Sequence, residues 1–270
     1  MEKAALLDKW ARYAKYIDIK DATFSNLVYF HAFTGSFKNK KFLFDKLSNC
    51  NIYAFDMPGH GESKIIDDNE INIHNFINLA TEFIIDFDIK NIILFGHSMG
   101  GGICNIINGN SQINSRVKKI ILEAPANPAT QKNYDAIIKK LIPNSIEEME
   151  LITNELFYDP IQFFGSQKNY LRFVNFEFSK LNKLQVLKQI IEITNYKVIN
   201  IEATDFILNN NKPSLLILGK QDEIIPYDET LEIFSKNKNF EILSVDKAKH
   251  LPILEGKDFV FEKIVSFIEN

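Results

Sequence analysis

Short apolar blocks alternate along the chain with longer segments in which apolar residues recur at helical spacing. The short blocks predict β-strands, and the longer segments predict α-helices between and after them. The strands are expected at residues 26–30, 51–56, 91–95, 117–123, 214–218 and 240–245. The helices are expected at residues 36–49, 71–88, 99–110, 227–236 and 258–268. Almost wholly apolar strands that alternate with helices predict an α/β fold, in which helices cover both faces of a mostly parallel sheet.

One long stretch interrupts this alternation. Residues 126–204 have a mostly helical pattern between two expected strands, and the stretch is longer than an ordinary crossover connection. We therefore expect a helical cap subdomain at 126–204, inserted into a core made of residues 1–125 and 205–270. The many aromatic side chains of the cap fit either an apolar wall around a substrate or packing among the cap helices.

The composition narrows the class of protein. The chain has 270 residues, 46% hydrophobic and 24% charged, which is an ordinary globular mixture. A net charge of −4 argues against nucleic-acid binding, and we expect the asparagine and lysine clusters to lie on the solvated surface. No apolar run is long enough to span a membrane, and the first residues do not resemble a secretory signal. With Cys50 and Cys104 expected as free thiols, these features predict a cytoplasmic protein.

The most informative local pattern is GHSMG at residues 96–100. It comes directly after the expected strand 91–95 and directly before the helix 99–110. A serine on so tight a strand-to-helix turn has a strained backbone, and the flanking glycines relieve crowding, so the Ser98 hydroxyl is presented above the sheet. The Met99 amide begins the helix, where an unsatisfied N–H can hold an oxyanion. An ordinary glycine turn is the alternative interpretation.

A serine nucleophile needs a base. The chain has five histidines, and His250 lies in a loop after the last expected strand, where catalytic groups of parallel sheets assemble. His97 is adjacent to Ser98, and neighbouring side chains on a sharp turn diverge. His74 fits a helix start and His60 a turn. We therefore predict His250 as the base.

The base in turn needs an orienting acid. Asp222 follows the expected strand 214–218, and the chain order serine, aspartate, histidine is the one expected of this arrangement. Glu123, at the end of an expected strand, is the main alternative because it could also approach the histidine. Glu223 could substitute for its neighbour.

Together, these segments resemble the α/β-hydrolase superfamily in their order and spacing. They are HAFTGS at 31–36, DMPGHGES at 56–63, GHSMGG at 96–101, and the loops of Asp222 and His250. The resemblance implies an α/β-hydrolase fold with a triad of Ser98, Asp222 and His250. It also implies an oxyanion hole made by the backbone N–H groups of Phe33 and Met99, and a structural turn held by Asp56, Gly59 and Gly61.

The chain departs from the family pattern in two places. Ala32 stands where the family usually has glycine, and its Cβ restricts positive φ beside Phe33. The segment before residue 26 is short, so the usual opening pair of antiparallel strands is reduced to about 13–19 and 23–24, after a helix at 2–10. The sheet is then expected to have seven or eight strands.

The predicted function is that of a serine esterase, a carboxylesterase that cleaves small esters with an apolar acyl group through an acyl-enzyme. Monoacylglycerol lipase, lysophospholipase and thioesterase activities use the same triad and are the alternatives. A non-catalytic ligand-binding protein of the same fold is the alternative from another class. No H-x-x-x-H, C-x-x-C or G-x-G-x-x-G pattern indicates a metal or dinucleotide site, so no cofactor is expected.

Overall fold

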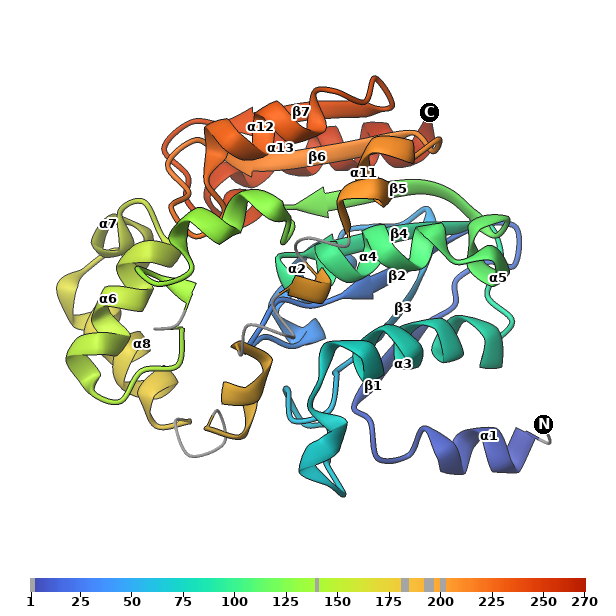
Figure 1. Ribbon diagram of the computed structural model, residues 1–270, viewed down its shortest axis with the longest axis horizontal. Helices are drawn as coiled ribbons and strands as arrows, with labels where there is room; N and C mark the ends of the chain where they lie inside the picture. The colour runs from blue at the N-terminus through green and yellow to red at the C-terminus, as the bar shows by residue number, and fades with distance from the viewer. Residues whose placement is uncertain (1–2, 139–140, 181–184, 192–196, 200–202) are drawn as a thin grey trace.

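A single mixed sheet forms the centre of the protein (Figure 1). The computed structural model describes residues 3–138, 141–180, 185–191, 197–199 and 203–270. Within these ranges the strand order is β1-β3-β2-β4-β5-β6-β7, and only β1 is antiparallel to its neighbour. The strands are β1 (Lys15–Asp18), β2 (Ser25–Phe30), β3 (Cys50–Phe55), β4 (Ile92–His97), β5 (Val117–Glu123), β6 (Ser214–Gly219) and β7 (Phe240–Val245). This is the fold that the sequence predicts.

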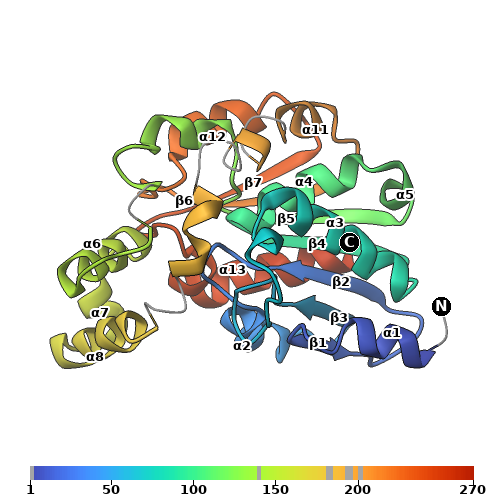
Figure 2. The same cartoon turned by 60° about the horizontal axis from the view of Figure 1, so that its bottom comes forward.

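Helices cover both faces of the sheet, and the strands are apolar because both faces are buried. In β2, Val28 faces the cluster beneath α3 and α4, whereas Leu27 faces the cluster beneath α2 and α13. The same two layers can be followed in Figure 2. The helices of the core, with η for 3₁₀ helices, are α1 (Lys3–Lys9), η1 (Phe37–Lys40), α2 (Lys41–Phe44), η2 (Asp68–Glu70), α3 (Ile73–Asp86), α4 (Met99–Gly109), α5 (Ser111–Asn114), α11 (Ala203–Asn209), α12 (Tyr227–Phe234) and α13 (Pro252–Glu269).

The structure refines the expected elements at their ends. The helix expected at 36–49 is only the short pair η1 and α2. α13 is kinked at Lys257, which has a φ of +47°, so the helix expected at 258–268 forms after the kink and a further helical stretch from Pro252 precedes it. Proline is well suited to a first helical turn because it lacks the N–H that would be unpaired there. Of the two opening strands, only β1 forms; residues 23–24 are turn and bend, which leaves seven strands.

The segment expected to form a cap contains η3 (Pro128–Asn133), α6 (Ile146–Leu156), α7 (Pro160–Phe164), α8 (Gln167–Phe178) and η5 (Gln185–Ile191). Met149, Tyr170 and Val174 form a small apolar cluster of their own between α6 and α8. Figure 1 shows α6, α7 and α8 grouped beyond the end of the sheet toward which β5 points. Residues 139–140, 181–184, 192–196 and 200–202 of the expected cap lie outside the described residues.

Candidate active site

The turn between β4 and α4 holds Ser98 in a strained backbone conformation. Its φ is +52° and its ψ is −117°, which is unusual for a residue other than glycine. A Cβ on Gly96 would lie 2.3 Å from the Gly100 carbonyl oxygen, and a Cβ on Gly100 would lie 2.0 Å from that of Phe30. The turn can therefore form only with glycine at these two positions, as the GHSMG pattern predicts.

Hydrogen bonds to neighbouring segments fix the backbone of Ser98. Its N–H donates to the Glu123 carbonyl oxygen at 3.0 Å, and its own carbonyl oxygen accepts the Ala126 N–H at 2.9 Å. The Gly101 N–H also donates to the Ser98 carbonyl oxygen, at 2.9 Å. The serine is thus tied both to its own helix and to the segment that leaves β5.

Asp222 and His250 meet at the carboxyl ends of β6 and β7, as predicted. The His250 Nδ1 lies 2.9 Å from Asp222 Oδ2, and both side chains are buried. The other oxygen, Oδ1, accepts the backbone N–H groups of Ile224 and Ile225, each at 2.9 Å. The carboxylate is therefore held by three donors and can fix the imidazole with a proton on Nδ1. Glu223 is exposed and takes no part in this arrangement.

His97, which precedes Ser98 in the chain, contacts the backbone of His250. The His97 Nε2 lies 3.0 Å from the His250 carbonyl oxygen, and the two imidazole rings have centroids 5.1 Å apart. Among the hydrogen bonds of the described residues, none joins the Ser98 hydroxyl to the His250 imidazole. In structures without substrate, the hydrogen bonds of catalytic groups are often long, so the lack of this bond does not rule out the predicted triad. The triad therefore stays a prediction.

Glu123 pairs with a residue that the sequence analysis missed. Its Oε2 lies 2.6 Å from the Lys40 Nζ, and the side chains are 0% and 1% exposed. Its Oε1 accepts the Ile253 N–H at 3.2 Å. Glu123 does approach a histidine, but the histidine is His97, whose Nδ1 is 3.8 Å from Oε2. The main alternative to Asp222 is therefore engaged elsewhere.

Lys40 is an exception to the expectation that the lysine clusters lie on the solvated surface, because it is buried while Lys38 and Lys41 are exposed. It is the last residue of η1, and it has helical spacing with Phe37, Phe44 and Leu47, which are all buried. A lysine that shares the apolar face of a predicted helix with such neighbours is itself expected to be buried, and it then needs an anionic partner. This periodicity is the signal that could have identified Lys40 from the sequence.

The loop that carries Phe33 is braced by a buried histidine. The His31 Nδ1 donates to the Ala32 carbonyl oxygen at 2.8 Å, and its Nε2 accepts the Met57 N–H at 2.9 Å. These partners require a neutral ring, in agreement with burial, which lowers the pKa of His31. Positive φ occurs at Thr34 and not at Ala32, so the Cβ of Ala32 carries no strain of this kind.

Asp56 holds the turn that follows β3. Its Oδ1 accepts the Phe37 N–H at 2.8 Å and its Oδ2 accepts the Glu62 N–H at 3.2 Å, while burial raises the pKa of the carboxyl. Gly59 and Gly61 both have positive φ, and a Cβ on Gly61 would lie 1.8 Å from Asp56 Oδ2. These contacts agree with the structural role that the family resemblance implies for the three residues.

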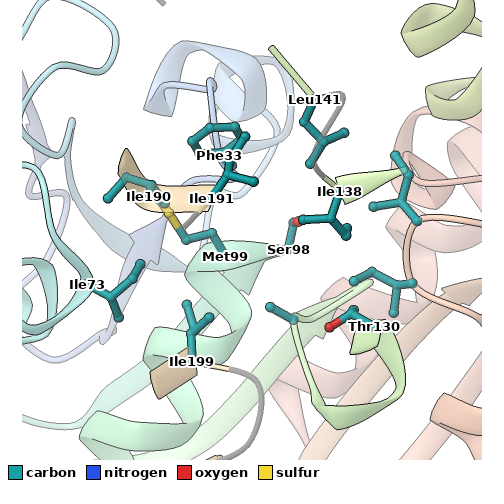
Figure 3. Close-up of a pocket in the computed structure, with 13 residues that line it drawn as sticks. Phe33, Ile73, Ser98, Met99, Thr130, Ile138, Leu141, Ile190, Ile191 and Ile199 are labelled. Atoms are coloured by element: carbon teal, nitrogen blue, oxygen red, sulfur yellow. The ribbon is translucent and has the colours of Figure 1, made fainter. Parts of the chain in front are cut away.

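An apolar pocket that is open to solvent lies next to Ser98 (Figure 3). Ser98 and Thr130 supply the hydroxyl groups on its wall, which is otherwise made of apolar side chains. Phe33 and Met99 line it from the core, and Ile138 and Ile190 line it from the segment expected to form the cap. Ser98, Phe33 and Met99 therefore open onto one apolar space, whereas Asp222 and His250 are not among the residues that line it.

Among the described residues, no aromatic side chain of the segment expected to form the cap lines this pocket. Phe157 instead packs against Phe163, Phe164 and Phe173, with ring centroids 4.7, 5.3 and 6.0 Å apart. Of the two interpretations of these rings, packing among the cap helices is the one that the contacts favour.

Within the described part of the chain, no cluster of three or more histidine, cysteine, aspartate or glutamate side chains is placed to hold a metal ion. Across the same residues, no helix combines the length and the apolar character needed to cross a bilayer.

The chain is similar to several known proteins. It is 30% identical to "Putative esterase/lipase 1" of Mycoplasma genitalium over 232 residues, which are 85% of each chain. It is 28% identical to the protein of the same name in Mycoplasma pneumoniae, over 90% of this chain and 91% of the other.

Solved structures share the fold at lower identity. An esterase from Exiguobacterium antarcticum superimposes with a TM-score of 0.76 at 16% identity, over 96% of each chain. A meta-cleavage product hydrolase from Pseudomonas fluorescens IP01 gives a TM-score of 0.80 at 14% identity, over 95% of this chain and 94% of the other. A family model described as "alpha/beta hydrolase fold" matches residues 26–257. The chain therefore belongs to the α/β-hydrolase family.

Proposed function

We propose that the protein hydrolyses carboxylic esters through an acyl-enzyme formed on Ser98. The observation that carries this proposal is the buried 2.9 Å contact between Asp222 and His250, in loops beside the strained turn that presents Ser98. The names of the Mycoplasma relatives, which describe esterases or lipases, support the same class of reaction.

In the proposed reaction His250 acts as general base and then as general acid. Asp222 accepts a hydrogen bond from the Nδ1–H group, so the proton stays on Nδ1 and the lone pair of the imidazole lies on Nε2. As the Ser98 oxygen attacks the ester carbonyl carbon, Nε2 takes the hydroxyl proton. Nε2 then gives this proton to the departing alcohol, which leaves the acyl group on the serine. A water molecule, deprotonated by the same nitrogen, attacks the acyl carbon and releases the acid and the serine hydroxyl.

Two backbone N–H groups are proposed to stabilise the oxyanion of each tetrahedral intermediate. The Met99 N–H stands at the beginning of α4, where the helix dipole favours negative charge. The Phe33 N–H belongs to the loop braced by His31, and both residues line the pocket at Ser98. Donors fixed in advance cost no reorganisation when charge develops, which is why such sites accelerate acyl transfer.

The apolar pocket supports an ester with an apolar acyl group as the substrate. Burial of apolar surface contributes about 25 cal/mol per Å², so a hydrocarbon chain in this pocket would gain binding energy in proportion to the apolar surface that it buries there. We also propose that residues 126–204 form a cap over a core of 1–125 and 205–270; pocket walls drawn from both parts support this division. The cytoplasmic location expected from the sequence remains part of the proposal.

Fluorophosphonate labelling and p-nitrophenyl ester hydrolysis test the proposed nucleophile and its partners. Ser98→Ala should abolish labelling, and Ser98→Ala, His250→Ala and Asp222→Asn should each lower kcat by a factor on the order of 10³ or more. Glu223→Gln, at the exposed neighbour of the proposed acid, is the matched control and should keep wild-type activity.

Two results would contradict the proposal. Absence of labelling of the intact wild-type protein would favour a ligand-binding protein of this fold, and full activity in Asp222→Asn would remove the proposed acid. Parallel assays with p-nitrophenyl esters from acetate to laurate, monoacylglycerols, lysophospholipids and acyl thioesters distinguish the esterase from the alternatives.

A further inference from the structure

His97 contacts the proposed base through the backbone of the base. Its Nε2 lies 3.0 Å from the His250 carbonyl oxygen. A carbonyl oxygen only accepts hydrogen bonds, so His97 must carry a proton on Nε2. Burial, and next the nearby Lys40 cation, hold the pKa of His97 well below its usual value of 6.5. The ring is therefore neutral, and its Nδ1 carries no proton.

The charges beneath His97 bear on which nitrogen holds the proton. Glu123 Oε2 lies 3.8 Å from the bare Nδ1. A lone carboxylate at this position would favour a proton on Nδ1 and would thereby oppose the hydrogen bond to His250. Lys40, with its Nζ 2.6 Å from the same oxygen, neutralises the carboxylate. The ion pair thus fits the tautomer that the His250 carbonyl requires.

The loop before His250 is held closely against the Asp222 loop as well. A Cβ on Gly219 would lie 2.0 Å from the Lys249 carbonyl oxygen, so the two loops pack without space between them. Asp222 orients the ring of His250, and His97 holds its backbone. The base is therefore restrained at two separate points.

We propose that His97 is a positioning residue for His250, and that the Lys40–Glu123 ion pair keeps the His97 proton on Nε2. This inference rests on the proposed function, in which His250 transfers protons at Ser98. Loss of the His97 hydrogen bond removes no reacting group, but it releases the main chain of His250 and so disturbs the aim of the imidazole. The effect should therefore fall on kcat rather than on KM.

A pair of substitutions at His97 tests the positioning role. His97→Gln keeps a neutral N–H donor at a similar reach, whereas His97→Leu removes the donor and keeps an apolar side chain of similar bulk. We expect His97→Leu to lower kcat for a p-nitrophenyl ester about tenfold with KM unchanged, and His97→Gln to stay within about threefold of wild type. A purely structural role would lower Tm in both variants, and Gln would not restore kcat.

The tautomer can be measured in the wild-type protein, independently of whether any variant folds. Long-range ¹H–¹⁵N NMR, with the His97 signal assigned by its loss in His97→Gln, should show the proton on Nε2. Lys40→Met should move that proton toward Nδ1. A proton on Nδ1 in the wild type, or a wild-type kcat in His97→Leu, would overturn the positioning role. An unchanged tautomer in folded Lys40→Met would overturn the part assigned to the ion pair.

Comparison of Ser98→Ala with His97→Leu separates the positioning role of His97 from the proposed esterase activity. If Ser98→Ala is inactive while His97→Leu has wild-type kcat, the serine mechanism stands and only the positioning role falls. If Ser98→Ala retains activity, the proposed function itself is wrong.

Discussion

Removal of one charge from the buried Lys40–Glu123 pair should destabilise the fold strongly. The two side chains are 1% and 0% exposed and their charged atoms lie 2.6 Å apart. In Lys40→Met the carboxylate would keep the Ile253 N–H at 3.2 Å but would lose its cation. In Glu123→Gln the Ile253 contact can persist while the ammonium loses its anion. A buried charge left without its partner costs about 3–5 kcal/mol.

Removal of both charges should cost less than removal of either one. The Lys40→Met/Glu123→Gln double variant has no buried charge to desolvate, and neutral replacement of a buried ion pair is often close to neutral for stability. The double-mutant cycle should therefore give a coupling energy of several kcal/mol, well above the additivity error of about 0.5 kcal/mol.

Thermal unfolding measures these effects. With an unfolding entropy of about 2.1 cal/mol/K per residue over 270 residues, a loss of 3–5 kcal/mol lowers Tm by about 5–9 °C. The transition can be followed by circular dichroism and by the fluorescence of Trp10, which is the only tryptophan and is fully buried. If either single variant melts within about 1 °C of wild type, or if the double variant loses the sum of the two single losses, the pair does not act as argued.

Two further predictions concern buried histidines and the nucleophile turn. Burial lowers the pKa of His31 and His97, so below about pH 6.5 the unfolded chain binds protons that the folded chain does not. The free energy of unfolding should therefore decrease as the pH is lowered, by up to about 1.4 kcal/mol per pH unit for each histidine. Urea unfolding between about pH 7.5 and 5.5 checks this, and an unchanged midpoint would refute it. Gly100→Ala should give little folded protein by circular dichroism and size-exclusion chromatography, because its Cβ would lie 2.0 Å from the Phe30 carbonyl oxygen; a folded variant with wild-type Tm would show that the turn can adapt.

The elements of the core were predictable because their signals are local. Strands such as β4 and β5 are continuous apolar runs, and their ends lie within a residue or two of the expected ones. The GHSMG pattern carries its own steric explanation, since Gly96 and Gly100 have no room for a Cβ. The contact between Asp222 and His250 was expected because loops at the carboxyl ends of neighbouring parallel strands meet.

The missed features depend on contacts between distant segments. Lys40 is buried because Glu123 lies across the fold, and no neighbouring residue indicates which partner it finds. The expected helix at 36–49 is interrupted at Lys40, whose φ of −113° and ψ of 5° are not helical, although the buried positions keep a helical spacing across the break. The contact of His97 with the His250 backbone likewise joins residues far apart in the sequence and leaves no local pattern.

The hydrogen bonds between the nucleophile turn and the end of β5 have a consequence for how the protein could diversify. Because the Ala126 N–H binds the Ser98 carbonyl oxygen, the chain is clamped to the nucleophile just where it departs from the sheet. Insertions, deletions or replacements farther along the segment that follows β5 can reshape the wall of the apolar pocket while the Ser98 hydroxyl keeps its position. Changes in that one segment can therefore alter the substrate specificity without moving the proposed nucleophile.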